Sequence, residues 1–220
     1  MNRVKVLAEG QTEVKFVNSI LAPFWGSKGI ALAPVLLRER GGSFRYSRIQ
    51  KEITNALKSE SRVYVTTFVD YYGMPNDWPG REAANAYQTV QEKAKTIEDA
   101  LLSDIQKQMG EPFNPARFIP YVQMHEFEAL LFSDPIVLAN SLGETALSEY
   151  FDKIRNSFSS PEAINDNFET CPSRRITNVY PQFKKTINGI TAAGHIGLNQ
   201  MRQACPHFNE WITKLESLAE

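Results

Sequence analysis

Acidic side chains follow three apolar segments that have the composition of buried β-strands. Glu9 and Asp70 each directly follow such a segment, and Glu126 and Glu128 come soon after a third. Open parallel sheets bind ligands at the carboxyl ends of their strands, so we expect these acids to converge at one edge. Clustered carboxylates raise one another's pKa unless a cation neutralises them. Because oxygen-only ligation suits Mg²⁺ and Mn²⁺, we predict a metal site formed by Glu9, Asp70, Glu126 and Glu128.

These acids also have ordinary structural explanations. Taken alone, Glu9 or Asp70 is better explained as a helix cap or turn residue, whereas three acids at equivalent strand ends favour a shared site. Glu126 and Glu128 are two residues apart, so on a continuous helix their side chains point about 200° apart. We therefore expect them to share a site only if the helix begins after them. Glu128 is favoured, because its apolar neighbours then define the buried side of the helix.

Positive charge is unevenly distributed, although 24 Lys+Arg against 25 Asp+Glu leave a net charge of −1. Residues 170–209 contain five cations and no acid, which favours a surface that meets anions. Residues 38–62 contain seven cations and three acids, and a solvated helix face explains this stretch equally well.

Phosphoryl chemistry also needs a cation beside the reacting oxygens. Adjacent cations on a helix point apart, so one residue of each adjacent pair within residues 170–209 is expected to face the site. Of these cations we predict Lys184 as the catalytic one. Contacts to nucleic-acid phosphates are predicted for Arg45, Arg48, Arg174, Arg175 and Lys185. Beside Asp70, the rings of Tyr71, Tyr72 and Trp78 are candidates for base stacking, and core packing explains at least one of them equally well.

The elements that must position these residues alternate along the chain. Strands are predicted over residues 3–8, 30–37, 62–69 and 116–124. The helix after the first strand is expected to be capped by Thr12, and a long helix with Tyr87 on its buried stripe is expected over residues 81–109. This order predicts an α/β fold in which helices cover a parallel sheet of about four strands. After His125 the pattern is helical almost to the end, which predicts a C-terminal helical extension.

Several protein classes do not match the sequence. Two cysteines in 220 residues are too few for a disulfide framework and fit a reducing cytoplasm. We find no apolar run of membrane-spanning length and no signal-peptide layout, so neither a membrane nor an exported protein is expected. No Gly-x-x-x-x-Gly-Lys-Ser/Thr motif is present, so this chain is not expected to hydrolyse ATP by itself.

Two of these segments resemble the motifs of Toprim domains. Val6-Leu7-Ala8-Glu9-Gly10-Gln11-Thr12-Glu13 resembles the first motif, in which a strand ends in Glu-Gly before a helix. Thr67-Phe68-Val69-Asp70-Tyr71-Tyr72 resembles the second motif, an apolar strand that ends in Asp-x-Asp. Together with the run from His125 to Phe132, these segments resemble a bacterial Toprim-like family, often encoded beside an ABC-type ATPase in phage-defence loci.

The resemblance implies a Toprim-like α/β domain over residues 1–132 and a helical extension over residues 133–220. It implies a Mg²⁺- or Mn²⁺-dependent nuclease of DNA or RNA, acting as an effector of anti-phage defence or a toxin-like system with a separate ATPase partner. Glu9 would be the general acid/base or a metal ligand and Asp70 a metal ligand. With Glu128 and Lys184, these residues form the predicted catalytic set.

Tyr72 stands where the Toprim pattern has its second Asp. A complete metal site then needs an oxygen from Glu126, Glu128 or the loop residue Asp77. Without that oxygen, the resemblance implies a non-catalytic binding or regulatory subunit of the same type of complex. A phosphohydrolase or nucleotide-binding enzyme that uses the same crevice on a small substrate is a further alternative. The oligomeric state is left open.

Overall fold

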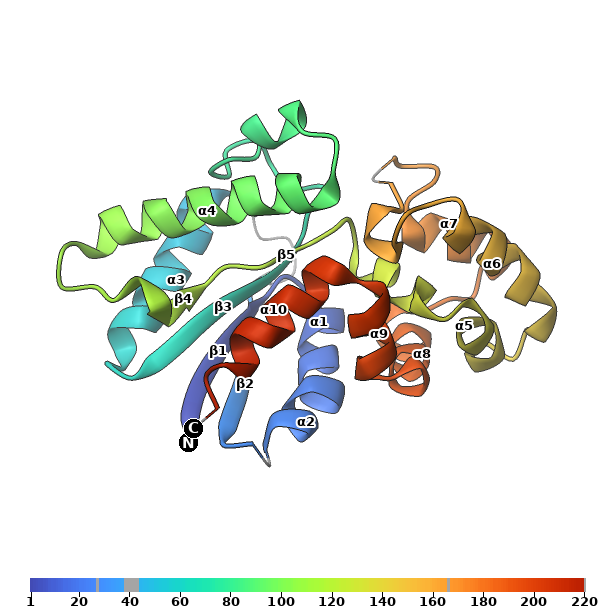
Figure 1. Ribbon diagram of the computed structural model, residues 1–220, viewed down its shortest axis with the longest axis horizontal. Helices are drawn as coiled ribbons and strands as arrows, with labels where there is room; N and C mark the ends of the chain where they lie inside the picture. Colours follow the sequence, from blue (N-terminus) through green and yellow to red (C-terminus); the bar gives the residue numbers. More distant parts are fainter. Residues whose placement is uncertain (27, 38–43, 166, 220) are drawn as a thin grey trace.

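A computed structural model describes residues 1–26, 28–37, 44–165 and 167–219 (Figure 1). Its strands are β1 (Asn2–Ala8), β2 (Ile30–Leu36), β3 (Val63–Asp70), β4 (Phe118–Ile119) and β5 (Val122–Gln123). Its α-helices are α1 (Gln11–Phe16), α2 (Ala22–Gly26), α3 (Tyr46–Ser59), α4 (Val90–Met109), α5 (Pro135–Ser141), α6 (Ser148–Asn156), α7 (Pro172–Val179), α8 (Ile190–Ile196), α9 (Leu198–Ala204) and α10 (Pro206–Glu216).

Short helical segments of other types connect these elements. The 3₁₀-helices are η2 (Ala83–Ala86), η3 (Pro115–Arg117), η4 (Phe127–Ser133), η5 (Thr145–Leu147) and η6 (Pro161–Ala163), and the π-helical segments are η1 (Val17–Leu21) and η7 (Lys185–Gly189). Within the described ranges, no helix is both long and apolar enough to cross a membrane.

The sheet is parallel, with the order β2-β1-β3-β4, and β5 pairs with the far end of β3. Ala8 of β1 lies opposite Phe68 of β3, so these two strands end side by side. The predicted α/β fold with a parallel sheet, helices around it and a helical C-terminal region is confirmed.

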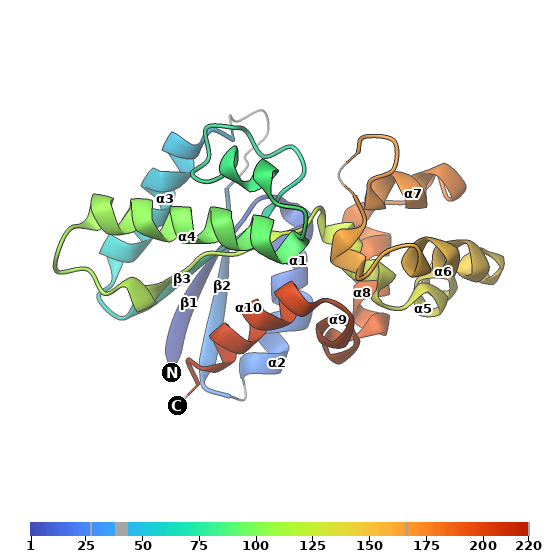
Figure 2. The same cartoon turned by 45° about the horizontal axis from the view of Figure 1, so that its top comes forward.

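Alternating side chains of the central strands define two cores, one on each face of the sheet. Val4 and Phe68 face a core formed with α1, α2 and α10, whereas Leu7 and Val65 face a core formed with α3 and α4. Figures 1 and 2 show these helices on opposite sides of the strands. Both faces are therefore covered, as the apolar strands predict.

The first helix begins differently from the prediction. Its N-cap is Gly10, and Thr12 is buried inside the first turn, so the predicted Thr12 cap is wrong. Residues 11–26 run continuously through the π-helical segment η1. The buried face of this continuous helical segment includes Phe16, Val17, Leu21 and Trp25.

The predicted fourth strand is interrupted. Pro120 separates β4 from β5, because proline has no N–H to donate to a neighbouring strand. Thr67 replaces the missing ladder bonds: its Oγ1 accepts a hydrogen bond from the Tyr121 N–H (2.9 Å) and donates one to the Tyr121 carbonyl (2.8 Å). The acids that follow β5 therefore keep their connection to the edge of β3.

The long helix also starts later than predicted. It begins at Val90, where Thr89 accepts a hydrogen bond from the Glu92 N–H, and Ala83–Ala86 forms a separate 3₁₀-helix. Tyr87 lies between them and is 42% exposed, so it does not belong to the buried stripe. Arg38, Arg40 and the Gly41-Gly42 pair lie outside the described residues.

The C-terminal helical region packs beside the sheet and then returns onto it. Figure 2 shows α5 to α8 gathered beside the sheet, with α10 lying under the strands. Trp211 of α10 stacks on Tyr121 with 4.2 Å between ring centroids, and its Nε1–H donates to Thr66 Oγ1 of β3 (2.8 Å). The last helix is therefore part of the core that β1 and β3 form with α1.

Candidate functional site

Glu9 and Asp70 meet at the carboxyl edge of the sheet. Because β1 and β3 are parallel neighbours, Glu9, which follows β1, and Asp70, the last residue of β3, lie at the same edge of the sheet. The Asp70 N–H donates a hydrogen bond to Glu9 Oε2 (3.1 Å), and the Glu9 N–H donates to the Phe68 carbonyl (3.0 Å). The convergence that the sequence predicts for these two acids is present in the structure.

Glu13 is a further acid of this edge that the sequence analysis did not assign to the site. It is 6% exposed and its Oε2 accepts a hydrogen bond from the Gly10 N–H (2.8 Å), which holds the start of α1 against the strand end. A Cβ atom at Gly10 would lie 2.9 Å from this oxygen, so a larger residue would require the Glu13 carboxylate to shift. The signal was available, because the first motif pairs Glu9-Gly10 with an acid three residues later.

Glu126 and Glu128 approach the same cation, although the sequence predicts that they share a site only if the helix begins after both of them. The 3₁₀-helix η4 begins between them, and Glu126 has extended backbone angles (φ −139°, ψ 157°), so the helical 200° relation does not apply. Lys185 Nζ lies 2.7 Å from Glu128 Oε2 and 3.6 Å from Glu126 Oε1. Glu126 is also fully hydrogen bonded, because Ser173 donates its N–H to Oε2 (2.9 Å) and its hydroxyl to Oε1 (3.0 Å).

Lys185, and not Lys184, is the cation that faces the acids. Lys184 is the exposed N-cap of η7, and its N–H donates to Asn188 Oδ1 (2.8 Å). The side chain of the next residue, Lys185, is 45% exposed, and its ammonium group contacts the buried Glu128. Lys15 of α1 donates to the Thr186 carbonyl (3.2 Å), which ties this segment to the first helix.

The acids perturb one another strongly. Burial raises the pKa of Asp70 well above its ordinary value, and the charges of Glu13, Glu9 and Glu128 raise it further. Burial also raises the pKa of Glu128, to about 7, although Lys185 opposes that shift. Burial lowers the pKa of Lys185, but Glu128, Glu126 and Asp70 together raise it more, so the net shift is upward. The ionised forms of these acids are therefore unfavourable, and the positive charge of Lys185 only partly offsets this effect.

Two carboxylate oxygens are sealed from solvent without a hydrogen-bond partner among the described residues: Asp70 Oδ1 and Glu128 Oε1. A buried ionised oxygen in this state is unfavourable unless it is protonated or binds a cation. Within the described ranges, no three His, Cys, Asp or Glu side chains are spaced to hold a metal ion as they stand. The donor chemistry still fits Mg²⁺ or Mn²⁺, and Asp70 and Glu128 are the residues that would hold it, with Glu9 and Glu13 beside them.

Other predicted site residues have structural tasks. Asp77 Oδ2 accepts a hydrogen bond from the Tyr46 N–H (3.0 Å) at the start of α3, so it caps that helix. Tyr71 and Trp78 are each 1% exposed and belong to the core under α3 and α4. The third aromatic candidate beside Asp70, Tyr72, is partly exposed and lines a pocket.

The arginines predicted to contact nucleic acid also lie in different surroundings. Arg175 Nε donates to the Thr170 carbonyl (2.6 Å), so this guanidinium is committed to the loop before α7. Arg174 is exposed and lines a pocket beside Glu126 and Lys185. Arg45 and Arg48 lie at the start of α3, which covers the opposite face of the sheet from α1.

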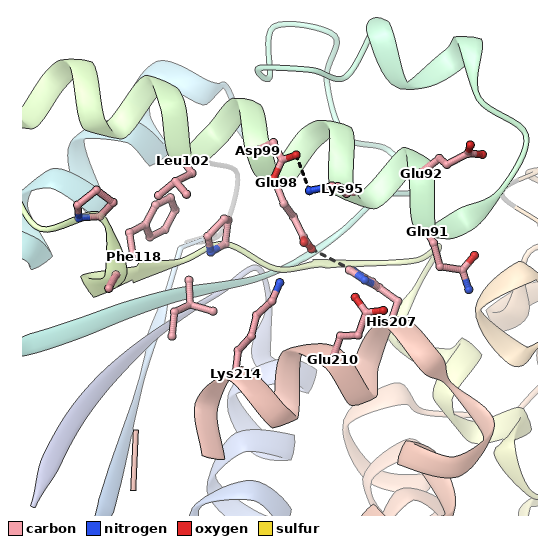
Figure 3. A pocket seen from close by; sticks show the side chains of 14 residues that line it. Gln91, Glu92, Lys95, Glu98, Asp99, Leu102, Phe118, His207, Glu210 and Lys214 are labelled. Carbon is pink, nitrogen blue, oxygen red and sulfur yellow. Dashed lines mark hydrogen bonds and ion pairs between the residues drawn. The ribbon is translucent and has the colours of Figure 1, made fainter. Parts of the chain in front are cut away.

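A separate pocket of about 470 Å³ lies between α4 and α10 over β4 (Figure 3). Glu98 and His207 point toward each other in it, with 3.0 Å between Oε1 and Nε2. Glu98 Oε1 also accepts a hydrogen bond from the Val122 N–H (3.0 Å). These polar groups have partners in the fold, in contrast to the oxygens of Asp70 and Glu128, so we place the candidate active site at the sheet edge.

Comparison with known proteins gives one match. Neither a curated protein nor a solved structure matches the chain. Residues 8–216 match the family described as Domain of unknown function (DUF4276), so the matched region includes the acids of the sheet edge, Lys185 and the helices that close over them. The chain belongs to the DUF4276 family.

Proposed function

We propose that this protein is a metal-dependent nuclease that hydrolyses phosphodiester bonds in DNA or RNA, using Mg²⁺ or Mn²⁺. The observation that carries the proposal is the pair of buried, unpartnered oxygens on Asp70 and Glu128 at the carboxyl edge of a parallel sheet. Glu9 and Glu13 add negative charge at the same place. A site of this composition attracts a hard cation and, through it, a phosphate group.

In this proposal the acidic side chains and Lys185 have separate roles. Asp70 and Glu128 would hold the cation, and Glu9, whose Oε2 accepts a hydrogen bond from the Asp70 N–H, is the candidate to carry a proton at the edge. A cation bound there would supply Lewis-acid polarisation of a phosphoryl oxygen and would lower the pKa of a water molecule. Lys185 offers an ammonium group, at 2.7 Å from Glu128, to negative charge that develops on the non-bridging oxygens. Glu126 positions α7 through Ser173.

The proposal includes a cellular setting: a cytoplasmic effector of anti-phage defence or a toxin-like system that works with a separate ABC-type ATPase. The resemblance of the segments around Glu9, Asp70 and Glu126 to a Toprim-like family supports this setting. The sequence itself has no phosphate-binding loop of the ATPase type, which agrees with ATP hydrolysis on a different subunit.

A non-catalytic binding subunit is the second candidate. It is favoured by Tyr72 in place of the second Asp and by the ion pair between Lys185 and Glu128, which already occupies one carboxylate oxygen. The two candidates differ in one respect: only the nuclease turns over a phosphodiester.

Incubation with labelled single- and double-stranded DNA and RNA distinguishes them. The nuclease proposal predicts Mn²⁺-dependent cleavage that chelation abolishes, and at least about a hundredfold less cleavage by Asp70→Asn, because a required ligand is lost. The variant should keep the wild-type melting temperature or exceed it. Cleavage by Asp70→Asn at the wild-type rate would contradict the proposal, and binding of nucleic acid without cleavage would favour the binding subunit.

A further inference from the structure

A second cavity opens directly beside the acid cluster. It has a volume of about 350 Å³ and shares Glu126 and Lys185 with the cluster. Its remaining walls come from the segment after β3, through Tyr72, and from the loop and helix around α7, through Phe168 and Arg174. A group bound in this cavity would therefore lie next to a phosphate held at the sheet edge.

The walls of this cavity are suited to a flat, electron-rich ring. Phe168 is 61% exposed, which is unusual for a phenyl group in a folded chain. The Arg174 guanidinium lies 4.5 Å from the centroid of the Phe168 ring. Tyr72 and Phe183 supply two further rings. Aromatic faces combined with a planar cation are the means by which proteins stack bases without reading their sequence.

Arg174 is available for this task. In the described part of the chain it forms no ion pair, and it lies within the stretch 170–209 that contains no acid. Its neighbour Arg175 differs, because the Thr170 carbonyl accepts from its Nε. The Arg174 guanidinium already lies over one face of the Phe168 ring, and a planar cation stacked on an exposed ring matches both the negative charge and the planar base of a nucleotide.

We propose that this cavity is a stacking subsite for one unpaired nucleotide adjacent to the cleaved phosphate, so that the substrate is single-stranded where it enters the site. A base within a duplex is covered on both faces by its neighbours and cannot present a face to Phe168. The cavity volume lies near the lower limit of about 300 Å³ for ligand pockets, which suits one base and not a base pair. This inference rests on the proposed nuclease function for its biological meaning, but not for its test.

The test measures binding of an oligonucleotide in the presence of EDTA, so it requires neither a metal ion nor turnover. A fluorescent oligonucleotide of about 12 nucleotides, as a single strand and as a duplex, is titrated with wild type, Phe168→Ala and Arg174→Gln, and anisotropy is measured. Both variants should weaken single-strand binding by roughly 5- to 150-fold, the range of one lost base stack, and change duplex binding less than about twofold. Phe168→Trp should retain wild-type affinity.

Tyr87→Ala is the matched control, since it removes an aromatic ring that is 42% exposed and lies outside the cavity. It should leave both affinities unchanged. Equal losses for single strand and duplex, no loss for Phe168→Ala, or no nucleic-acid binding by wild type would each overturn the subsite. Selective loss of single-strand binding in a protein that never cleaves would uphold the subsite and reject the nuclease. Cleavage that depends on Asp70 but not on Phe168 would uphold the nuclease and reject the subsite.

Discussion

Lys185 is the residue on which the charge balance of the site depends. Its ammonium group contacts Glu128 at 2.7 Å and Glu126 at 3.6 Å, and it lowers the pKa of Asp70 against the effect of burial and the neighbouring acids. The side chain of Lys185 is 45% exposed, so one side of this cation faces solvent. Its neighbour Lys184 has the same charge and stem but faces solvent.

The two adjacent lysines therefore form a matched pair of variants. Lys185→Met should reduce cleavage at least about a hundredfold, because it removes the cation that faces the developing charge. Lys184→Met should reduce it less than about threefold, since an exposed charge acts weakly through solvent. Initial cleavage rates at saturating Mn²⁺ measure both. Equal rates for the two variants would show that Lys185 has no special role.

At the scale of elements, the start of α1 controls the acids. Gly10 allows Glu13 to fold back onto the Gly10 N–H, so the same turn caps the helix and brings a second acid to the end of β1. Helix and site are thus coupled through the hydrogen bond from the Gly10 N–H to Glu13 Oε2 (2.8 Å), and a Cβ added at Gly10 would lie 2.9 Å from the same oxygen.

Gly10→Ala should disturb both functions of this turn. We expect a loss of about 1 kcal/mol in the free energy of unfolding, the usual value of a lost cap, together with reduced Mn²⁺ affinity. Gly194→Ala is the control, because a Cβ there meets no atom within 4 Å in helix α8. That control should be neutral or stabilising by up to about 1 kcal/mol. Urea unfolding checks both, and an unperturbed Gly10→Ala protein would contradict the coupling.

The regular elements were predictable because their signals are local. The stripe Tyr46, Ile49, Ile53 and Leu57 is the buried face of α3, and the acids after β1 and β3 converge as parallel neighbours must. Interruptions were harder to predict. Pro120 divides an apolar segment into β4 and β5, and Thr67 of the neighbouring strand compensates for the interruption through its hydrogen bonds with Tyr121. The π-helical segment after Phe16 is likewise not indicated by the spacing of apolar residues.

The site was predictable only in part for a related reason. Strand ends identify Glu9 and Asp70, but which of two adjacent lysines faces inward depends on where η7 begins, and that is set by Asn188 and by contacts with α1. Likewise, Glu126 and Glu128 meet one cation because a 3₁₀-helix starts between them. These features depend on tertiary packing, which a single sequence does not display.

At the scale of the whole molecule, His207 joins the last helix to the sheet and to α4. Its Nε2 lies 3.0 Å from Glu98 Oε1, its ring stacks on Tyr121, and Glu162 accepts hydrogen bonds from the His207 N–H (3.0 Å) and the Phe208 N–H (2.8 Å). Burial lowers the pKa of His207, but Glu98, Glu162 and Glu210 raise it more, so the net shift is upward.

This raised pKa predicts a pH-dependent stability. A group whose pKa is higher in the folded state stabilises the fold below its ordinary value of 6.5 and loses that contribution as pH rises through the folded value. The difference in unfolding free energy between wild type and His207→Gln should therefore be larger at about pH 6 than at about pH 9. Urea unfolding across this range measures it. A difference that grows with pH would contradict the assignment of charge to His207.

The central claim is that the edge of the sheet binds a divalent cation through Asp70 and Glu128. Calorimetric titration of Mn²⁺ into the metal-free protein tests it most directly, with Asp70→Asn and Glu128→Gln as site variants. Glu149→Gln, which alters an exposed carboxylate with 79% side-chain exposure on α6, serves as the control. Tyr72→Asp, which adds the acid of the Toprim pattern, completes the set.

We predict saturable binding to wild type and to Glu149→Gln, and at least about tenfold weaker binding, or 1.4 kcal/mol, for each site variant. Tyr72→Asp should bind as well as wild type or more tightly. Wild-type affinity in both Asp70→Asn and Glu128→Gln would contradict the claim. So would the absence of binding to wild type together with its appearance in Tyr72→Asp, which would identify the native edge as a degenerate site and favour the non-catalytic binding subunit.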